Sequence, residues 1–178
     1  MLKSDLWHDI PPGSQAPNVV YAVIEIPRGQ RNKYEYNKHL GVIQLSRVLF
    51  SPMHYPGDYG FIPQTCGDDG DPLDILVMVT EPTFPGCIIE ARPIGVFHMT
   101  DGVEADDKIL AVPAADPLFG SYHSVKDVPP HFLAEVSHFF QTYKQLEGIE
   151  VTPIGWEDAE VARECIQRAI RLYKKQYC

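Results

Sequence analysis

Three aspartates lie within six positions in the segment Asp69-Gly70-Asp71-Pro72-Leu73-Asp74. Carboxylates packed so closely repel one another, so a folding role alone does not account for them. Hard oxygen ligands of this kind suit divalent cations such as Mg²⁺. Asp-Gly pairs and Pro72 predict a stiff turn, and the apolar run 74–79 after it predicts a buried strand. The segment therefore favours a metal site on a rigid loop over a solvated acidic turn.

A second acidic segment repeats this layout at residues 101–108, which read Asp-Gly-Val-Glu-Ala-Asp-Asp-Lys. It lies between two strand-like runs, 94–99 and 109–112. By itself it would be read as an acidic hairpin tip. Together, the two segments could supply the carboxylates for several Mg²⁺ ions, because each such ion keeps waters and uses few protein ligands.

Basic and phenolic side chains accompany the acidic segments. Lys33 and Glu35 stand two apart in a strand-like run, so their side chains would share one face. Arg47 ends the next such run, a turn-rich loop with two tyrosines follows at 55–60, and Lys144 ends a predicted helix. A lone Lys or Arg is usually a solvated surface group. Metal sites combined with basic clamps, however, are what transfer of a phosphoryl group requires.

Taken in order, these segments resemble the family I soluble inorganic pyrophosphatases, in particular the short bacterial type. The Asp-Gly-Asp-Pro-x-Asp run is the most specific of the matches, which extend from about residue 19 to about residue 160. The matching pieces are Val23–Pro27, Lys33–Glu35, Arg47, Tyr55–Gly60, Asp69–Asp74, Arg92–Val96, Met99–Asp101, Asp106 with Lys108, Ala111–Pro113, His138–Phe140, Tyr143–Lys144 and Gly155–Trp156.

The resemblance implies several Mg²⁺ ions per site, with Mn²⁺ or another divalent ion as a substitute. Six carboxylates would hold them, namely Asp69, Asp74, Asp106, Asp101, Glu25 and Glu35. Asp69, Asp74 and Asp106 would bind the tightest ion, and Asp74 would be shared with a second. A water activated by these ions would be the nucleophile, and Asp71 would accept its proton as general base.

The same resemblance implies hydrolysis of inorganic pyrophosphate to two orthophosphates. The groups that would bind the phosphates are Lys33, Arg47, Tyr59, Lys108, Tyr143 and Lys144. Lys33, Arg47 and Tyr59 would act with Asp71 as catalytic residues, and Tyr55 would line the site. Many members of the family carry Glu where this chain has Gly102, which puts only outer water contacts to the metals in doubt.

Three other functions remain open. A calcium-binding structural module is disfavoured because Gly70 and Pro72 stand at the wrong positions for an EF-hand and Thr80 occupies its twelfth position. A two-metal nuclease would need a basic path for nucleic acid, which this acidic chain lacks. A homologue without activity is disfavoured because the Asp, Lys, Arg and Tyr set is complete.

Composition limits the partners. The chain has 178 residues, a formal net charge of −9 and a pI near 5.1, which argues against nucleic acid as the ligand. No apolar run reaches membrane-spanning length. The four cysteines form no close pairs and indicate reduced thiols, so we expect a cytoplasmic protein. Short members of the family are usually homohexamers built from two trimers, and the resemblance implies the same here.

The length predicts one domain over residues 1–178, and the resemblance implies that it is an inorganic pyrophosphatase domain. Residues 1–18 predict an irregular lead-in, and residues 19–112 read as strands with turns about every ten residues, as in a small barrel. Helical spacing follows up to Gly148, and a second helix begins near Asp158. With the resemblance, the fold expected is α+β and mainly β: a small five-stranded OB-like barrel with two flanking α-helices.

Overall fold

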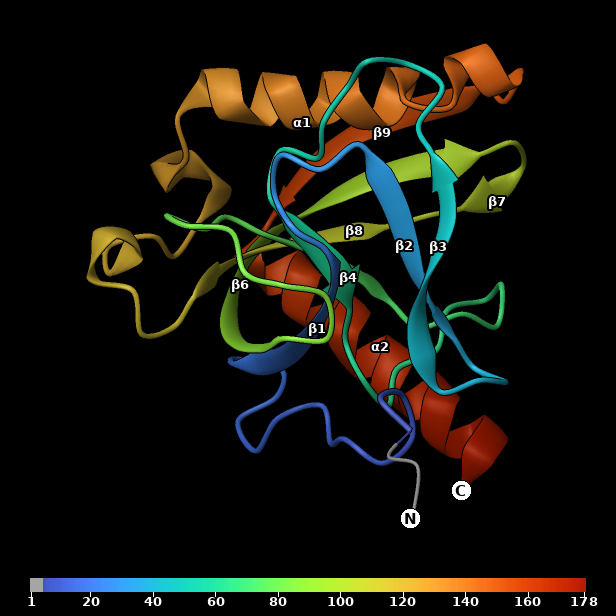
Figure 1. The fold of residues 1–178 in the computed structure, drawn as a ribbon. Coiled ribbons are helices and arrows are strands. Elements are labelled where there is room, and N and C mark those ends of the chain that lie inside the picture. The colour runs from blue at the N-terminus through green and yellow to red at the C-terminus, as the bar shows by residue number, and fades with distance from the viewer. Residues whose placement is uncertain (1–4) are drawn as a thin grey trace.

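The computed structural model describes residues 5–178 and contains nine strands and two α-helices in that range (Figure 1). The strands are β1 (Val20–Ile26), β2 (Asn32–Asn37), β3 (Val42–Val48), β4 (Asp58–Phe61), β5 (Asp74–Val77), β6 (Ile88–Asp101), β7 (Glu104–Ala105), β8 (Lys108–Pro113) and β9 (Val151–Asp158). The helices are α1 (Pro130–Thr142) and α2 (Ala159–Tyr177), with short 3-10 turns η1 (Pro117–Phe119), η2 (Val125–Asp127) and η3 (Gln145–Glu147).

Five strands close into a ring, in the order β1-β4-β5-β8-β6 and back to β1. All neighbours in the ring are antiparallel except β5 and β8, which are parallel. Strands β2 and β3 form a separate two-stranded hairpin beside the ring, while β7 and β9 extend it from β6. The predicted five-stranded OB-like barrel with two flanking helices is therefore confirmed.

The long strand β6 joins the parts of the fold, because it pairs with β1, β8, β7 and β9 along its 14 residues. Its pairing with β8 shifts register between Pro93 and Gly95, which indicates a bulge. Bulges bend a strand and increase its twist. This lets one strand belong to the closed ring at one end and to the β7–β9 extension at the other.

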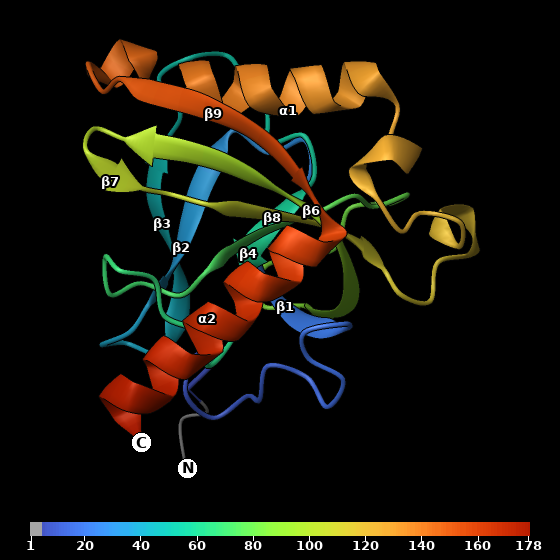
Figure 2. The same cartoon turned by 180° about the vertical axis from the view of Figure 1, so that it is seen from behind.

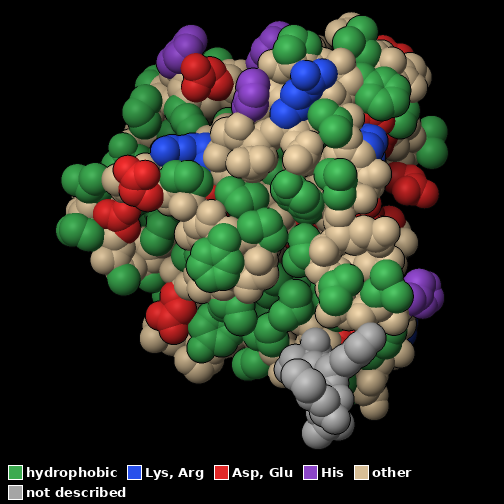
Figure 3. Space-filling view, in the orientation of Figure 1, with side chains coloured by type: hydrophobic (Ala, Val, Ile, Leu, Met, Phe, Trp, Pro, Cys, Tyr) green, Lys and Arg blue, Asp and Glu red, His purple; other side chains and the backbone are tan. Residues whose placement is uncertain are grey.

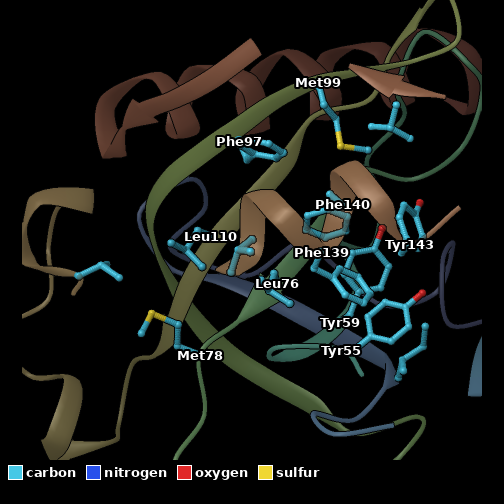
Figure 4. Close-up of a cluster of buried hydrophobic side chains, with 14 of the residues drawn as sticks. Tyr55, Tyr59, Leu76, Met78, Phe97, Met99, Leu110, Phe139, Phe140 and Tyr143 are labelled. Atoms are coloured by element: carbon cyan, nitrogen blue, oxygen red, sulfur yellow. The ribbon is translucent and has the colours of Figure 1, made fainter. Parts of the chain in front are cut away.

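Two apolar layers hold the helices against the barrel. Helix α1 covers one end, where the aromatic side chains of Tyr59, Phe97, Phe139 and Phe140 pack together (Figure 4). Helix α2 crosses the back of the barrel (Figure 2) and buries a face that includes Ala162, Ile166 and Ala169 against the strands.

The start of α2 follows from its capping residue. Asp158 has an extended backbone and its side chain accepts a hydrogen bond from the Ala159 amide at 2.8 Å. An aspartate at this position satisfies an amide that the helix itself cannot pair, and its negative charge suits the positive end of the helix dipole. Lys174 and Lys175 occupy the last turn, where positive charge is favourable.

Two expectations about local structure were wrong, and one strand was missed. The helix predicted up to Gly148 ends at Thr142, and a 3-10 turn follows, closed by Gly148 at a positive φ of 75°. Leu146, which continues the helical spacing of the sequence, lies beyond the end of α1 and is 64% exposed. Tyr59 lies in the buried strand β4 rather than in a loop. Strand β9 was not predicted at all, because its proline and glycine weaken the strand pattern.

Strands β1 and β4 approach each other closely at Gly60, and a substitution there can test this approach. A Cβ added at Gly60 would lie 1.9 Å from the Val23 carbonyl oxygen of the paired strand β1. Because that oxygen belongs to backbone, it cannot rotate away. We expect Gly60→Ala to reduce the free energy of unfolding by about 3 kcal/mol or more. Gly120→Ala is the control, because its new Cβ would approach its nearest atom only to 3.3 Å. Urea unfolding measures both, and equal midpoints would contradict the close approach of β1 and β4.

Candidate active site

A cavity of about 460 Å³ opens between the barrel, the β2–β3 hairpin and the end of α1. Of the fourteen residues predicted to form a site, thirteen line it; the exception is Arg47. The thirteen are Glu25, Lys33, Glu35, Tyr55, Tyr59, Asp69, Asp71, Asp74, Asp101, Asp106, Lys108, Tyr143 and Lys144. In the space-filling view, acidic and basic side chains gather together at the right edge, where Figure 1 places β3 and β7 (Figure 3).

Lys108 lies at the centre of the charged residues. The parallel register of β5 and β8 sets Asp74 opposite Lys108. The Lys108 Nζ donates to Asp74 Oδ2 and, at 2.5 Å, to Asp106 Oδ1. The Tyr59 hydroxyl, from the neighbouring strand β4, donates to the same Asp74 oxygen at 2.6 Å. Three adjacent strands of the ring, with the connection just before β8, therefore bring one ammonium, one phenol and two carboxylates into contact.

Burial and charge act in opposite directions on Lys108. The residue is only 3% exposed, and burial alone would lower its pKa. The carboxylates of Asp74 and Asp106 outweigh this and hold the pKa of Lys108 above its ordinary value. Burial likewise raises the pKa of Asp106, against the opposing effect of Lys108. Lys108 thus remains a positive charge that compensates the two aspartates.

Other carboxylates of the cavity also have a lysine partner. Within β2, Lys33 Nζ lies 2.5 Å from Glu35 Oε1, which confirms that the two share a face. Lys144, just after α1, pairs with Asp101 at the end of β6. The first pair stays within the hairpin, whereas the second links the end of α1 to the end of β6.

Glu25 and Asp69 differ from the other ligand candidates, because no lysine among residues 5–178 contacts either carboxylate directly. Burial raises the pKa of Glu25 to about 8, although the Tyr36 backbone amide donates to Glu25 Oε1 at 2.6 Å and opposes the shift. The nearby Asp74 adds to the increase. Glu25 is therefore mostly protonated at neutral pH in this arrangement, and a cation beside it would favour its ionised form.

Three phenols form the wall towards α1. Burial raises the pKa values of Tyr55, Tyr59 and Tyr143 well above 10, so all three remain hydrogen-bond donors. Their hydroxyls lie on one side of the aromatic cluster (Figure 4). The Tyr55 hydroxyl is buried and has no hydrogen-bond partner among the described residues. Such a group is costly unless something else satisfies it, which suits a polar ligand in the cavity.

The acidic loop keeps its shape through its own backbone. The Gly67 amide donates to the Asp71 carbonyl at 2.7 Å, and the Asp71 amide donates to Asp69 Oδ1 at 3.0 Å. Gly70 has a φ of 82°, a conformation that most other residues avoid. The sequence signal for a rigid turn is therefore borne out, with the Asp71 side chain on its exposed side.

The donor set suits a hard divalent cation, since every acidic ligand candidate offers carboxylate oxygen and all six face one cavity. Within residues 5–178, no three His, Cys, Asp or Glu side chains are gathered as a ready metal-binding group. At two of the candidate ligands, Asp74 and Asp106, the carboxylates contact the Lys108 ammonium instead. A cation at these aspartates would compete with that lysine for the same oxygens.

Two contacts could not be expected from sequence motifs. Arg47 donates from Nε to Glu147 Oε1 at 3.0 Å, across 100 residues of sequence, and does not line the cavity. Lys38, in the turn between β2 and β3, lies 2.7 Å from Asp71 Oδ1 and does line the cavity. A lysine in a polar turn normally indicates only a solvated surface, so no pattern marked Lys38.

The chain is similar to known proteins along nearly its full length. Residues 22–174 match the family described as inorganic pyrophosphatase. A protein named inorganic pyrophosphatase from Haloferax volcanii is 49% identical over 97% of this chain and 98% of its own length. One of the same name from Halalkalibacterium halodurans is 52% identical over 89% of this chain and 97% of its own. The crystal structure of inorganic pyrophosphatase from Thermus thermophilus superposes with a TM-score of 0.93 at 45% identity, covering 96% and 99% of the two chains.

The raised pKa of Glu25 makes stability depend on pH. A carboxyl whose folded pKa is near 8 binds its proton more tightly when folded, so its stabilising effect is complete below about pH 4.5 and is lost as the pH rises through 8. Glu25→Gln removes this titration. In EDTA, the unfolding free energy of wild type should fall relative to Glu25→Gln by about 3 kcal/mol between pH 5 and pH 8. Parallel urea midpoints for the two proteins across that range would contradict the shift.

Proposed function

Because the chain belongs to the inorganic pyrophosphatase family, it is a hydrolase of inorganic pyrophosphate, and we propose that it works with several Mg²⁺ ions and a metal-activated water. The observation that supports this most strongly is that carboxylates and lysines pair with one another on the walls of one cavity. A site that holds both divalent cations and a highly anionic substrate needs both kinds of group at once.

The carboxylates Asp69, Asp74, Asp101 and Asp106 would hold the ions, with Glu25 and Glu35 assisting through water. Divalent ions there would supply positive charge for the phosphate oxygens and a lower pKa for the attacking water. Asp71 would accept the proton of that water, since its exposed carboxylate faces the cavity and lies two residues from Asp69.

The basic and phenolic groups would bind the two phosphates. Lys33, Lys108 and Lys144 are all charged groups on the cavity wall that pair with carboxylates. When cations take over those carboxylates, the ammonium groups become available to phosphate oxygens. The protonated hydroxyls of Tyr55, Tyr59 and Tyr143 would add hydrogen bonds. Arg47 would have to exchange its contact with Glu147 to reach a phosphate.

The activity itself is the first test. Purified protein should release orthophosphate from pyrophosphate with Mg²⁺, and EDTA should abolish this release. Simple phosphomonoesters should be poor substrates with Mg²⁺, because the cationic groups lie on several walls of one cavity and suit two linked phosphates. Phosphate release from both substrates measures this. Equal Mg²⁺-dependent rates on a monoester and on pyrophosphate, or activity that persists in EDTA, would contradict the proposal.

A substitution separates proton transfer from metal binding. Asp71→Asn should lower turnover by about 10²- to 10⁴-fold, as expected for loss of a general base, with little change in Mg²⁺ affinity measured by calorimetry. Asp68→Asn is the matched control: it is the same change in the same loop, but Asp68 pairs with Arg168 and does not line the cavity. Loss of the tight Mg²⁺ site in Asp71→Asn would make Asp71 a ligand instead of a base.

We also propose that the chain forms a homohexamer of two trimers. Support comes from several large apolar side chains that are about half exposed along β3 and just beyond it, at Val42, Leu45, Val48 and Phe50. Exposed apolar groups gathered on one element favour burial against another chain. Light scattering should give roughly six times the chain mass of 20.1 kDa, and a monomer mass at micromolar concentration would contradict the assembly.

We propose the cytoplasm as the working compartment. All four cysteines are free thiols, which suits a reducing environment. Within the described part of the chain, no helix is long and apolar enough to cross a membrane.

A further inference from the structure

Among residues 5–178, the Asp71 carboxylate has one side-chain partner, and it is not one of the residues that the family resemblance assigns. The Lys38 Nζ lies 2.7 Å from Asp71 Oδ1. The side chain of Asp71 is 68% exposed, and an exposed aspartate samples several rotamers. The loop hydrogen bonds hold the backbone of Asp71 but leave its carboxylate free to turn. Lys38 is therefore the contact that selects one orientation of the carboxylate.

Lys38 is itself held in place. Its Nζ lies 4.1 Å from the centroid of the Trp7 ring, a cation–π arrangement. An exposed ion pair alone contributes little, because holding two flexible side chains in one geometry costs entropy. Trp7 reduces that cost, since its ring is only 2% exposed and cannot move away from the ammonium.

Trp7 is fixed to the root of the same acidic loop. Its Nε1 donates to the Thr65 carbonyl at 2.8 Å. The Thr65 hydroxyl accepts a hydrogen bond from the Leu73 amide at 2.9 Å, just before β5 begins. The indole also packs on the rings of His8 and Tyr177, at 4.4 Å and 5.3 Å. One tryptophan thus contacts both the base of the loop and the lysine that reaches the loop's carboxylate.

We propose that Lys38 is a positioning residue for Asp71, and that Trp7 fixes Lys38 so that the carboxylate points into the cavity in one orientation. This inference rests on the role of Asp71 as general base proposed above. A base that is misaligned with its proton donor loses rate even when the substrate binds normally. The N-terminal segment around Trp7 consequently contributes to turnover without touching substrate.

Steady-state kinetics test the catalytic part. Lys38→Met should lower kcat about tenfold, with KM for pyrophosphate and the melting temperature close to wild type. Lys38→Arg should restore most of the rate, because guanidinium can reach the carboxylate and stack on the indole. Lys126→Met, at an exposed position on η2 outside the cavity, is the matched control and should leave kcat unchanged. A raised KM with normal kcat in Lys38→Met would make Lys38 a substrate ligand and overturn the proposal.

A double-mutant cycle separates this inference from the proposed function. If Lys38 acts through Asp71, Lys38→Met should cost nothing further in an Asp71→Asn background. Full additivity of the two losses would overturn the positioning role. Wild-type kcat in Lys38→Met beside an impaired Asp71→Asn would overturn this inference alone. Wild-type kcat in Asp71→Asn would instead contradict the proposed general base, and the positioning role with it.

Fluorescence gives a readout that does not depend on activity. In a Trp156→Phe background, Trp7 is the sole tryptophan of the chain. Lys38→Met should shift its emission maximum because the cation over the ring is lost. Asp71→Asn should shift the emission in the same direction, because Lys38 loses its anchor, and the double variant should match Lys38→Met. An emission spectrum unaffected by either substitution would show that the Trp7–Lys38–Asp71 contact does not form in solution.

Discussion

Compensation of charge is the constraint on which this structure depends. A cavity that gathers seven predicted acidic side chains can form only if their repulsion is offset. The protein offsets this repulsion with ammonium groups. Lys108 compensates the most negative charge, because it is nearly excluded from solvent and contacts two aspartates. The parallel pairing of β5 and β8, which sets Asp74 opposite Lys108, is therefore as much a requirement of the site as of the barrel.

The same pairs explain how one cavity can accept two kinds of ligand of opposite sign. Each lysine neutralises a carboxylate, and each carboxylate keeps a lysine extended towards the cavity. A divalent cation and an anionic phosphate that enter together can replace the internal pair without a large change of net charge. Each ion pair that the protein loses is replaced by one contact to the cation and one to the phosphate. This favours binding of the two ligands together over binding of either one alone.

Much of the fold and the site could be predicted because the signals were local. The acidic segments, the alternation of Lys33 and Glu35, and the start of a helix near Asp158 all depend on a few neighbouring residues. The acidic side chains line one cavity, Lys33 and Glu35 share a face, and α2 begins at Ala159. The errors arose where tertiary contacts decide. Strand β9 forms because it pairs with β6, although its own sequence has a weak strand pattern. Lys38 and Trp7 meet from positions 31 residues apart, and no local pattern encodes such a contact.

The contact between Trp7 and Tyr177 has a consequence for protein engineering. It places the beginning of the described chain beside its last residues. A short flexible linker could join such ends, and the chain could then be reopened at an exposed connection such as the one between β5 and β6. A circular permutant of this kind would turn the N-terminal segment into an internal connection, with its tryptophan still packed under the acidic loop.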